Sequence, residues 1–546
     1  MLTSCNDMLE TVPQGQFTAE QLDANSVEGL IASAYAGLEA HFFGNNESFA
    51  GPSTNWIFDV RSDDAYKGGG GTSMEENIHL LEVSELTTSN ISCLNKWQND
   101  YYAISRVHNA MLAVQQSNGL ENAAQLLGEL KTLRAWYYFD LIRIYKRIPY
   151  FIEGEDVNTK TNDEFTREEI FSFIKRDLTE AIEALPAQKS SVGRITRTTA
   201  QAILAKVCAF TSDWQGTLAN ANAVIQSGQY SLYENFGDLS KIDHNNGSES
   251  IFALQVSTAN DNAHINWSNL LNCTYSDGNL YGTGDDFFYA SQNLVNAFQT
   301  NQDGLPLLDG SFNQQDVTEY FGGNVDPRLD FTVGRIGYPW RGYPYTAGWC
   351  RAYDTYGEYS NKKAWPAPEE ANDAWPWGCN SLNFMFIRYA DILLLKAEAL
   401  IELSSGTNAA TDQQLAEARS LVNEVRQRAA NSVDESYSPV DLDPYKANYL
   451  VGLYPTDHDG NLFWTRDRAR AAVRFERRLE LALEGNRWFD LVRWGNDYLI
   501  QTMNTYMEQE ADLRPYYKNR SVSDNEIFLP IHQDEIDNSN GLYKQY

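Results

Sequence analysis

Residues 474–494 read Arg474-Phe-Glu-Arg-Arg-Leu-Glu-Leu-Ala-Leu-Glu-Gly-Asn-Arg-Trp-Phe-Asp-Leu-Val-Arg-Trp494, within a helical pattern that begins near residue 467. Their charged side chains recur on one face of the predicted helix. Such a face more often stabilises the packing of helices than binds a ligand. We therefore predict a packing role for five of these residues: Arg474, Glu476, Arg477, Arg478 and Glu480.

The end of this stretch has a counterpart earlier in the chain. Trp136-Tyr-Tyr-Phe-Asp-Leu-Ile-Arg143 and Trp488-Phe-Asp-Leu-Val-Arg-Trp494 share an aromatic-Phe-Asp-Leu-apolar-Arg core. Two copies so far apart do not form a tandem repeat. We interpret them as two helices with equivalent packing, in which Trp and Phe are buried and each Asp lies near the Arg three residues later.

Helical periodicity marks most of both ends of the chain. Thr166 followed by Glu169 is a capping-box signature that opens one of the helices. Helix pairs that each carry one apolar stripe must stack to bury it, as in tetratricopeptide (TPR)-like arrays. The pattern predicts a mainly α fold with helices over 27–38, 97–111, 126–144, 170–182, 198–211, 215–227, 383–400, 412–429 and 467–494.

The pattern changes between residues 235 and 382, where Gly, Asn, Asp, Tyr and Trp become frequent. Runs such as 250–256 and 329–333 have the composition of strands, with turn-rich loops between them. This segment is predicted to be an irregular, loop-rich insertion with short strands inside one helical scaffold. The expected organisation is a tether at 1–17, helical parts at 18–234 and 383–546, and the insertion at 235–382.

The composition limits the classes of partner. A formal net charge of −32 argues against polyanions such as nucleic acid, although it also serves general solubility. The longest apolar run, Asp391–Ile401, is interrupted by Lys396 and Glu398, so no membrane span is predicted. Aromatic residues make up 13% of the chain, and exposed rings of this kind stack on sugars, while others must lie in the core.

Motifs for catalysis or metal binding are missing from the sequence. The seven histidines never fall three or four residues apart, and neither a GxSxG elbow nor a Walker loop occurs. Gly68–Gly71 has the composition of a flexible surface loop, and Asp457–Gly460 lacks the ligand spacing of an EF-hand. A glycosidase needs two carboxylates that flank the scissile bond. The sequence lacks the strand-helix alternation that would predict a (β/α) barrel to hold them. We therefore expect no enzyme activity, metal or cofactor.

Six cysteines are scattered without a CxxC pair, which excludes a disulfide framework and a zinc site. Cys208 lies in an apolar helical stretch and is predicted to be buried. Cys350 and Cys379 flank an aromatic segment, and either a disulfide between them or two free thiols fits the sequence.

Three stretches resemble the SusD/RagB family of Bacteroidetes: Leu133–Tyr145, Phe386–Ala399 and Arg474–Trp494. In addition, Met1-Leu-Thr-Ser-Cys5 resembles a bacterial lipobox, although no charged or apolar segment precedes Cys5. The resemblance implies a TPR-like scaffold held by a lipid on Cys5 at the outer face of the outer membrane. It also implies a SusC-like TonB-dependent transporter as partner, over which the protein closes like a lid.

Ligand contacts in this family come from variable loops. The matching loops here are rich in rings and polar groups, which suit a sugar. The resemblance thus implies these ligand-binding residues: Asp63, Asp64, Tyr66, Trp267, Tyr275, Asn279, Tyr281, Trp340, Arg341, Trp349 and Arg351.

The function predicted from the sequence is non-catalytic binding of a polysaccharide or oligosaccharide and its delivery to the transporter. Two alternatives remain open at this point. One is capture of peptides for import, as in the RagB branch, and the other is a TPR interaction scaffold without a small ligand.

Overall fold

The computed structural model describes residues 24–39, 51–117, 119–188, 191–259, 265–275, 280–371, 378–433, 442–443, 446–458 and 461–546. Three predicted features lie outside these residues: the lipidated tether 1–17 with Cys5, the ligand-binding residue Asn279, and the last two residues of Asp457–Gly460.

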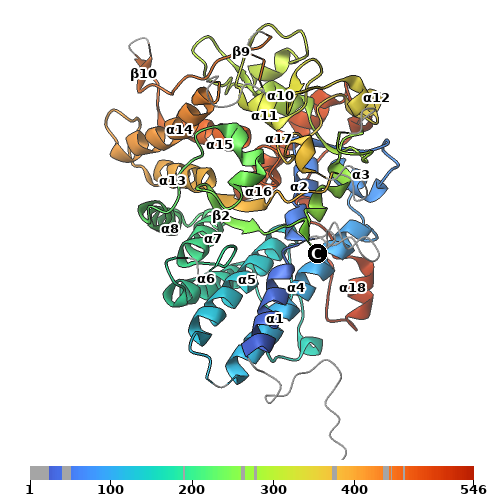
Figure 1. Cartoon of the computed structure of the whole chain (residues 1–546), viewed down its shortest axis with the longest axis vertical. Coiled ribbons are helices and arrows are strands. Elements are labelled where there is room, and N and C mark those ends of the chain that lie inside the picture. The colour runs from blue at the N-terminus through green and yellow to red at the C-terminus, as the bar shows by residue number, and fades with distance from the viewer. Residues whose placement is uncertain are drawn as a thin grey trace, which may run out of the picture.

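The protein is mainly helical, as predicted, and Figure 1 shows long antiparallel helices in the lower half and the irregular insertion at the top. The first part of the chain forms α1 (Ala24–Ala36), α4 (Ile91–Gln116), α5 (Ala123–Ile144), α6 (Arg167–Ala184), α7 (Arg197–Phe210) and α8 (Trp214–Gln226). The last part forms α13 (Tyr389–Leu403), α14 (Gln413–Asn431), α15 (Arg466–Glu480), α16 (Arg487–Arg493), α17 (Asn496–Glu510) and α18 (Gln533–Asn538).

The helical array continues across the insertion. Helix α4 packs on α5, α5 on α6, and α7 on α8. Helix α8 then packs directly on α13, which packs on α14, although the whole insertion separates α8 from α13 in the sequence. The two helical parts therefore share one apolar core, and the TPR-like scaffold is confirmed.

Local signals in the sequence are borne out at two places. Glu169 N–H donates to Thr166 Oγ1 at 3.2 Å and Thr166 N–H to Glu169 Oε2 at 2.8 Å, which completes the predicted capping box of α6. In the two related motifs, Trp136 and Trp488 are both buried, as predicted. Each aspartate also pairs with the arginine three residues later, Asp140 with Arg143 and Asp490 with Arg493.

The two motifs also touch each other. The guanidinium of Arg143 lies 3.9 Å from the ring centroid of Phe489, so the equivalent helix ends meet in the core.

Short elements make up the rest of the described chain. The short helices are α2 (Trp56–Val60), α3 (Glu76–Glu82), α10 (Gln292–Ala297), α11 (Arg328–Thr332) and α12 (Tyr353–Tyr356). The strands are β1 (Ala65–Gly68), β2 (Ser250–Leu254), β3 (Phe287–Ala290), β4 (Gln299–Thr300), β5 (Asn324–Val325), β6 (Pro339–Trp340), β7 (Tyr343–Pro344), β8 (Phe384–Arg388), β9 (Asn448–Tyr449), β10 (Asp457–His458) and β11 (Asn461–Leu462).

The structure corrects three predicted elements. Of residues 329–333, expected as a strand, the first four belong to helix α11, where Arg328 is held by Asp326 and Glu480, and only Val333 is extended. The helix expected from residue 383 starts only at Tyr389, because Phe384–Arg388 pair with β2 as strand β8. Tertiary pairing thus overrides local periodicity at both places.

The third correction concerns the helix predicted over 467–494, which breaks into α15 and α16. Gly485 at the break has a φ of +76°, and its N–H donates to Asp59 Oδ2 at 2.7 Å. A Cβ at this position would lie 2.4 Å from Asn55 Cβ. The close approach of the residue before α2 therefore requires glycine here, in the turn between α15 and α16.

Four of the five residues predicted to have a packing role on the charged face of α15 form ion pairs that hold the fold together. Buried Glu480 pairs with Arg328, Arg388 and Arg428. Burial alone would raise the pKa of Glu480, but the surrounding arginines hold it below its ordinary value. The remaining pairs of this face are Glu476 with Arg426, Arg477 with Asp391 and Asp490, and Arg478 with Asp64. Arg474 makes no such ion pair with any of the residues that the structure describes.

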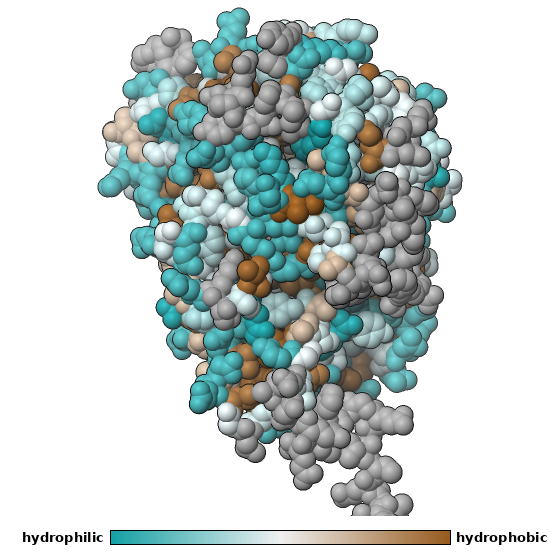
Figure 2. Space-filling model, viewed as in Figure 1, coloured by the Kyte–Doolittle hydropathy of each residue, from teal (hydrophilic) through white to brown (hydrophobic). Residues whose placement is uncertain are grey.

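The surface in Figure 2 is largely hydrophilic, with small, separate hydrophobic patches. Within the described ranges, no helix combines the length and the apolar composition needed to cross a membrane.

Candidate ligand-binding site

The predicted residues Asp63, Asp64 and Tyr66 are buried, each at most 2% exposed. Asp63 accepts hydrogen bonds from Arg487 at 2.7 and 2.8 Å, and Asp64 accepts one from Arg478 at 2.7 Å. The Tyr66 hydroxyl donates to Glu510. These side chains fasten the segment before β1 to the C-terminal helices, and in this conformation they present no surface to a ligand.

Three predicted aromatic residues form a buried cluster under the insertion's loops. The rings of Trp340 and Tyr345 stack at 5.4 Å and 14°, and Trp349 lies 5.4 Å from Trp340. Trp340 Nε1 donates to the Tyr281 hydroxyl at 3.0 Å, which donates to the Pro366 carbonyl at 2.6 Å. Trp340, Trp349 and Tyr281 therefore anchor the loops from below and do not form an exposed sugar platform.

Trp267 and Arg341 also have structural partners. Trp267 is 6% exposed and packs with Ile265 and Leu270 in a small separate cluster. The half-buried Arg341 donates to the Trp365 carbonyl at 3.0 Å. Both residues fasten loops of the insertion to one another.

Tyr275 and Arg351 are the two predicted residues that the structure places together at the surface. The Tyr275 side chain is 37% exposed, and the Arg351 guanidinium lies 5.5 Å from its ring centroid. Arg351 also pairs with Asp285. The backbone N–H of Tyr275 donates to the Trp349 carbonyl at 3.1 Å, so the backbone at Tyr275 is fastened to a residue of the buried aromatic cluster.

The glycine run beside this pair has a defined shape. A Cβ on Gly69 would lie 2.6 Å from the Phe287 ring, and a Cβ on Gly70 would lie 3.2 Å from Arg351 Nε. From beneath, the ammonium of buried Lys67 donates to the Gly71 carbonyl at 2.9 Å and to the Met74 carbonyl. Close packing therefore requires glycine at Gly68 and Gly69, whereas Gly70 is exposed and a Cβ on Gly71 would meet nothing within 4 Å.

We call the group Tyr275, Asp285, Arg351 and Gly70 the Tyr275–Arg351 site. Burial raises the pKa of Asp286, directly beneath it, to about 7. Asp286 Oδ2 accepts the Arg351 N–H at 2.8 Å. The site offers one ring face, a paired guanidinium and a carboxylate, which suit stacking on a ligand and hydrogen bonding to its hydroxyls.

Sequence reasoning missed Asp285, Gly70 and the exposed ring of Tyr353, which begins α12 two residues after Arg351. Tyr353 is 44% exposed. The four consecutive glycines were the one signal in the sequence, because such a run often marks a close approach of the backbone.

Cys350 and Cys379 are both buried free thiols, which corrects the alternative of a disulfide between them. Cys350 Sγ lies 3.3 Å from the Tyr345 hydroxyl, whereas Cys379 belongs to the separate cluster around Trp267. Among the described residues, no group of three or more His, Cys, Asp and Glu side chains could hold a metal ion.

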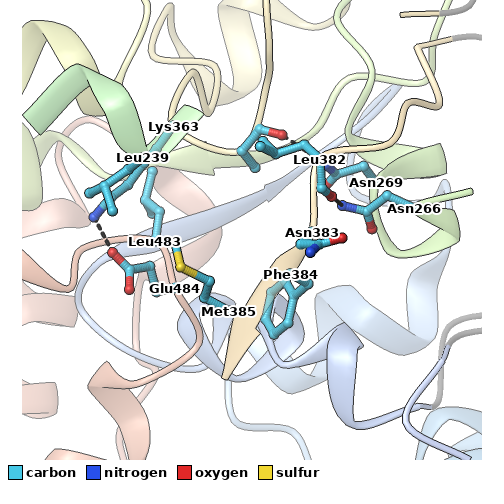
Figure 3. Close-up of a pocket in the computed structure, with 11 residues that line it drawn as sticks. Leu239, Asn266, Asn269, Lys363, Leu382, Asn383, Phe384, Met385, Leu483 and Glu484 are labelled. Atoms are coloured by element: carbon cyan, nitrogen blue, oxygen red, sulfur yellow. Dashed lines mark hydrogen bonds and ion pairs between the residues drawn. The ribbon is translucent and has the colours of Figure 1, made fainter. Parts of the chain in front are cut away.

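A second hollow, shown in Figure 3, lies between the insertion and the helical body. Apolar side chains such as Leu382, Phe384 and Leu483 line it, and the Lys363–Glu484 ion pair closes one end. Its volume of about 70 Å³ is far below the several hundred Å³ of ordinary ligand pockets. This hollow is therefore too small to hold a sugar.

Comparison with known proteins agrees with this architecture. A sequence model of the SusD family matches residues 248–546, and one described as "Starch-binding associating with outer membrane" matches residues 10–209. A curated SusD-like protein P38 of Formosa agariphila is 24% identical over 515 residues, which cover 90% of this chain and 88% of that protein.

Solved structures share the fold. A SusD superfamily protein from Bacteroides vulgatus has a TM-score of 0.72 at 20% identity, covering 96% of this chain and 98% of that one. Surface glycan-binding protein A from Bacteroides thetaiotaomicron, in complex with laminarihexaose, has a TM-score of 0.68 at 19% identity, covering 96% and 99%. Because the family model matches more than half of the sequence, the chain belongs to the SusD family.

Proposed function

We propose that this protein binds a glycan at the Tyr275–Arg351 site without changing it chemically. The observation that carries the proposal is an exposed ring with a paired arginine beside it, on a backbone that is hydrogen-bonded to the buried aromatic cluster at Trp349. Members of the SusD family are binding proteins, and one structural neighbour was solved with laminarihexaose. The fixed backbone of the glycine run supports a preformed site.

The place of action belongs to the same proposal. We infer that a lipid on Cys5 holds the protein at the outer face of the outer membrane, where it delivers its ligand to a SusC-like TonB-dependent transporter. Membership in the SusD family supports this inference, as does the match to a family described as associating with the outer membrane. Co-purification of the full-length lipoprotein with such a transporter from membranes would test it.

Isothermal titration tests the ligand and the site together. Laminarihexaose, maltoheptaose and xylohexaose would be titrated beside a protein digest. We expect saturable binding of one glycan, weakened roughly tenfold or more by Tyr275→Ala, because the variant removes the exposed stacking surface.

The matched control is Tyr102→Ala, which removes a ring that is 58% exposed on α4, in the other half of the molecule. The affinity of Tyr102→Ala for the glycan should equal that of the unchanged protein. Binding of peptides alone, or equal affinities of the two variants, would contradict the proposal. New reducing ends after long incubation with the bound glycan would contradict its non-catalytic character.

A further inference from the structure

A groove separate from the Tyr275–Arg351 site runs along α15. Two hollows of about 510 and about 400 Å³ share Leu308, Asp309 and Ala471 in their walls. We call the joined hollows the α15 groove. Tyr454, Phe463 and Arg468 line one end, and the other end is lined by Phe312, Arg474, Phe475, Tyr498, Gln501, Thr502 and Thr505.

Arg474 is the unusual residue of this groove. Its guanidinium lies 4.9 Å from the ring centroid of Trp494 and 4.8 Å from that of Tyr498. The two rings fix the position of the guanidinium. It makes neither a hydrogen bond nor an ion pair with any residue that the structure describes, and its Nε is buried without a partner. Buried donors without partners are rare and costly in folded proteins.

The carboxylates near Arg474 are engaged by other groups. Glu398 accepts hydrogen bonds from Arg493 at 2.6 and 2.9 Å and from Trp494 Nε1 at 2.7 Å. Glu402 accepts two from Arg470, at 2.6 and 2.8 Å. Asp309, which lines the same hollow, accepts hydrogen bonds from the N–H and the hydroxyl of Ser311, at 3.1 and 2.6 Å. No carboxylate of the described residues therefore forms an ion pair with Arg474.

Arg468, at the other end of the groove, is exposed and lies beside a single ring. It lies 4.1 Å from the ring centroid of Phe463 and has no ion pair within the described part of the chain. The other arginines of α15, by contrast, all pair with carboxylates: Arg466, Arg470, Arg477 and Arg478. Arg468 and Arg474 are six positions apart on α15, a rise of about 9 Å, and point about 120° apart around the helix axis. One extended ligand can reach both because the two hollows that they line are joined at Ala471.

We propose that the α15 groove is a second binding site, which takes the carboxylate groups of an acidic oligosaccharide. Arg474 is the main contact and Arg468 the second. A planar guanidinium forms two parallel hydrogen bonds with a carboxylate, and the flanking rings hold it ready for them.

The remaining lining favours a saccharide over an acidic peptide. Gln501, Thr502 and Thr505 on α17 face the groove, and their side chains make no hydrogen bond to other described residues. Unused amides and hydroxyls of this kind match sugar hydroxyls, while the half-buried rings of Phe312 and Phe475 offer apolar surface beside them.

The test is titration calorimetry with hexagalacturonate and with hexamannuronate. Each is compared with its methyl ester, which keeps the sugar chain but removes the charge. We expect binding of at least one acid, at least tenfold tighter than of its ester and weaker in high salt. Arg474→Gln should lower that affinity at least tenfold, with Arg474→Lys between the two because it keeps the charge without the planar fork.

The matched control is Arg176→Gln on α6, which also removes an exposed arginine stacked on a ring, Phe173 at 5.3 Å. Arg176→Gln should leave the affinity for the acidic oligosaccharide unchanged. Tyr275→Ala should also leave it unchanged, which would show that the α15 groove binds independently of the Tyr275–Arg351 site. Arg468→Gln should weaken binding less than Arg474→Gln and serves in its place if that variant does not fold. The proposal would be overturned if neither acid bound, or if an ester bound as tightly as its acid. It would also be overturned if the arginine variants bound as tightly as the unchanged protein, or if pentaglutamate bound as tightly as the acidic oligosaccharide.

Discussion

Most of the buried charged residues in this protein belong to ion pairs or networks that join distant parts of the chain. Asp63 and Arg487, 424 residues apart, share two hydrogen bonds, and Arg388 joins Glu249 to Glu480. A buried charge is tolerated only with such partners. Within the described residues, the half-buried Arg474 and the fully buried Arg61 have no carboxylate partner, and both guanidinium groups lie over aromatic rings.

The network around Glu480 predicts a large effect of one substitution. Glu480→Gln leaves Arg328, Arg388 and Arg428 with unbalanced charge in the core, so the free energy of unfolding should fall by about 3–5 kcal/mol. Urea unfolding followed by circular dichroism measures it. Glu180→Gln, which breaks the surface pair with Lys131, should cost less than about 1 kcal/mol. Equal losses in the two variants would contradict a structural role of the network.

Asp286 predicts a pH dependence. Burial raises its pKa from 3.8 to about 7, so its contribution to stability is fully present below pH 3.8 and is lost as the pH rises through 7. Asp286→Asn lacks this titration. Relative to that variant, the unchanged protein should lose about 4 kcal/mol between pH 4 and pH 8. Urea unfolding of both proteins across this range tests it, and parallel pH profiles would refute the assignment.

At the scale of elements, the glycine run after β1 shows how a loop receives its shape. Gly68, Gly69 and Gly71 have positive φ values, and Lys67 holds the run from below. The loop stands between β3 and Arg351, so its backbone supports one edge of the Tyr275–Arg351 site.

Gly69→Ala should therefore disturb both stability and binding. Its φ of +75° strains any side chain, and the new Cβ would also meet the Phe287 ring. We expect a loss of about 2–3 kcal/mol in urea unfolding, together with weaker glycan binding. Gly228→Ala has a similar φ of +65° with open space around the Cβ, so it should cost only about 1 kcal/mol and leave binding intact. Identical effects would mean that packing against Phe287 is unimportant.

At the scale of the whole molecule, the packing of α8 on α13 unites the two helical parts. Neither part can bury its apolar face without the other, so we expect a single cooperative unfolding transition. Circular dichroism, tryptophan fluorescence and calorimetry should give the same midpoint. Two separate transitions would show that the helical parts fold independently.

Much of the scaffold could be predicted from the sequence. Helix α7 and the capping box of α6 follow from residues three and four positions apart. Strand β8 and the break at Gly485 could not be predicted in this way, because β2 and Asp59, which cause them, are distant in sequence.

The candidate site could be predicted only in part. Composition correctly directed attention to the aromatic loops, but it could not tell Tyr275, whose ring is exposed, from Trp340, whose ring is fully buried. Tyr and Trp rings both pack well against a sugar face and inside a protein core, so the residue type alone does not predict which ring is exposed.

The sequence by itself determined the family, the helical scaffold and the packing role of most charges on α15, because these depend on local periodicity and on motifs read along the chain. The tertiary structure alone decided which rings and charges remain at the surface. Exposure depends on partners supplied by distant segments, as Arg487 buries Asp63 while Arg474 remains unpaired beside the groove.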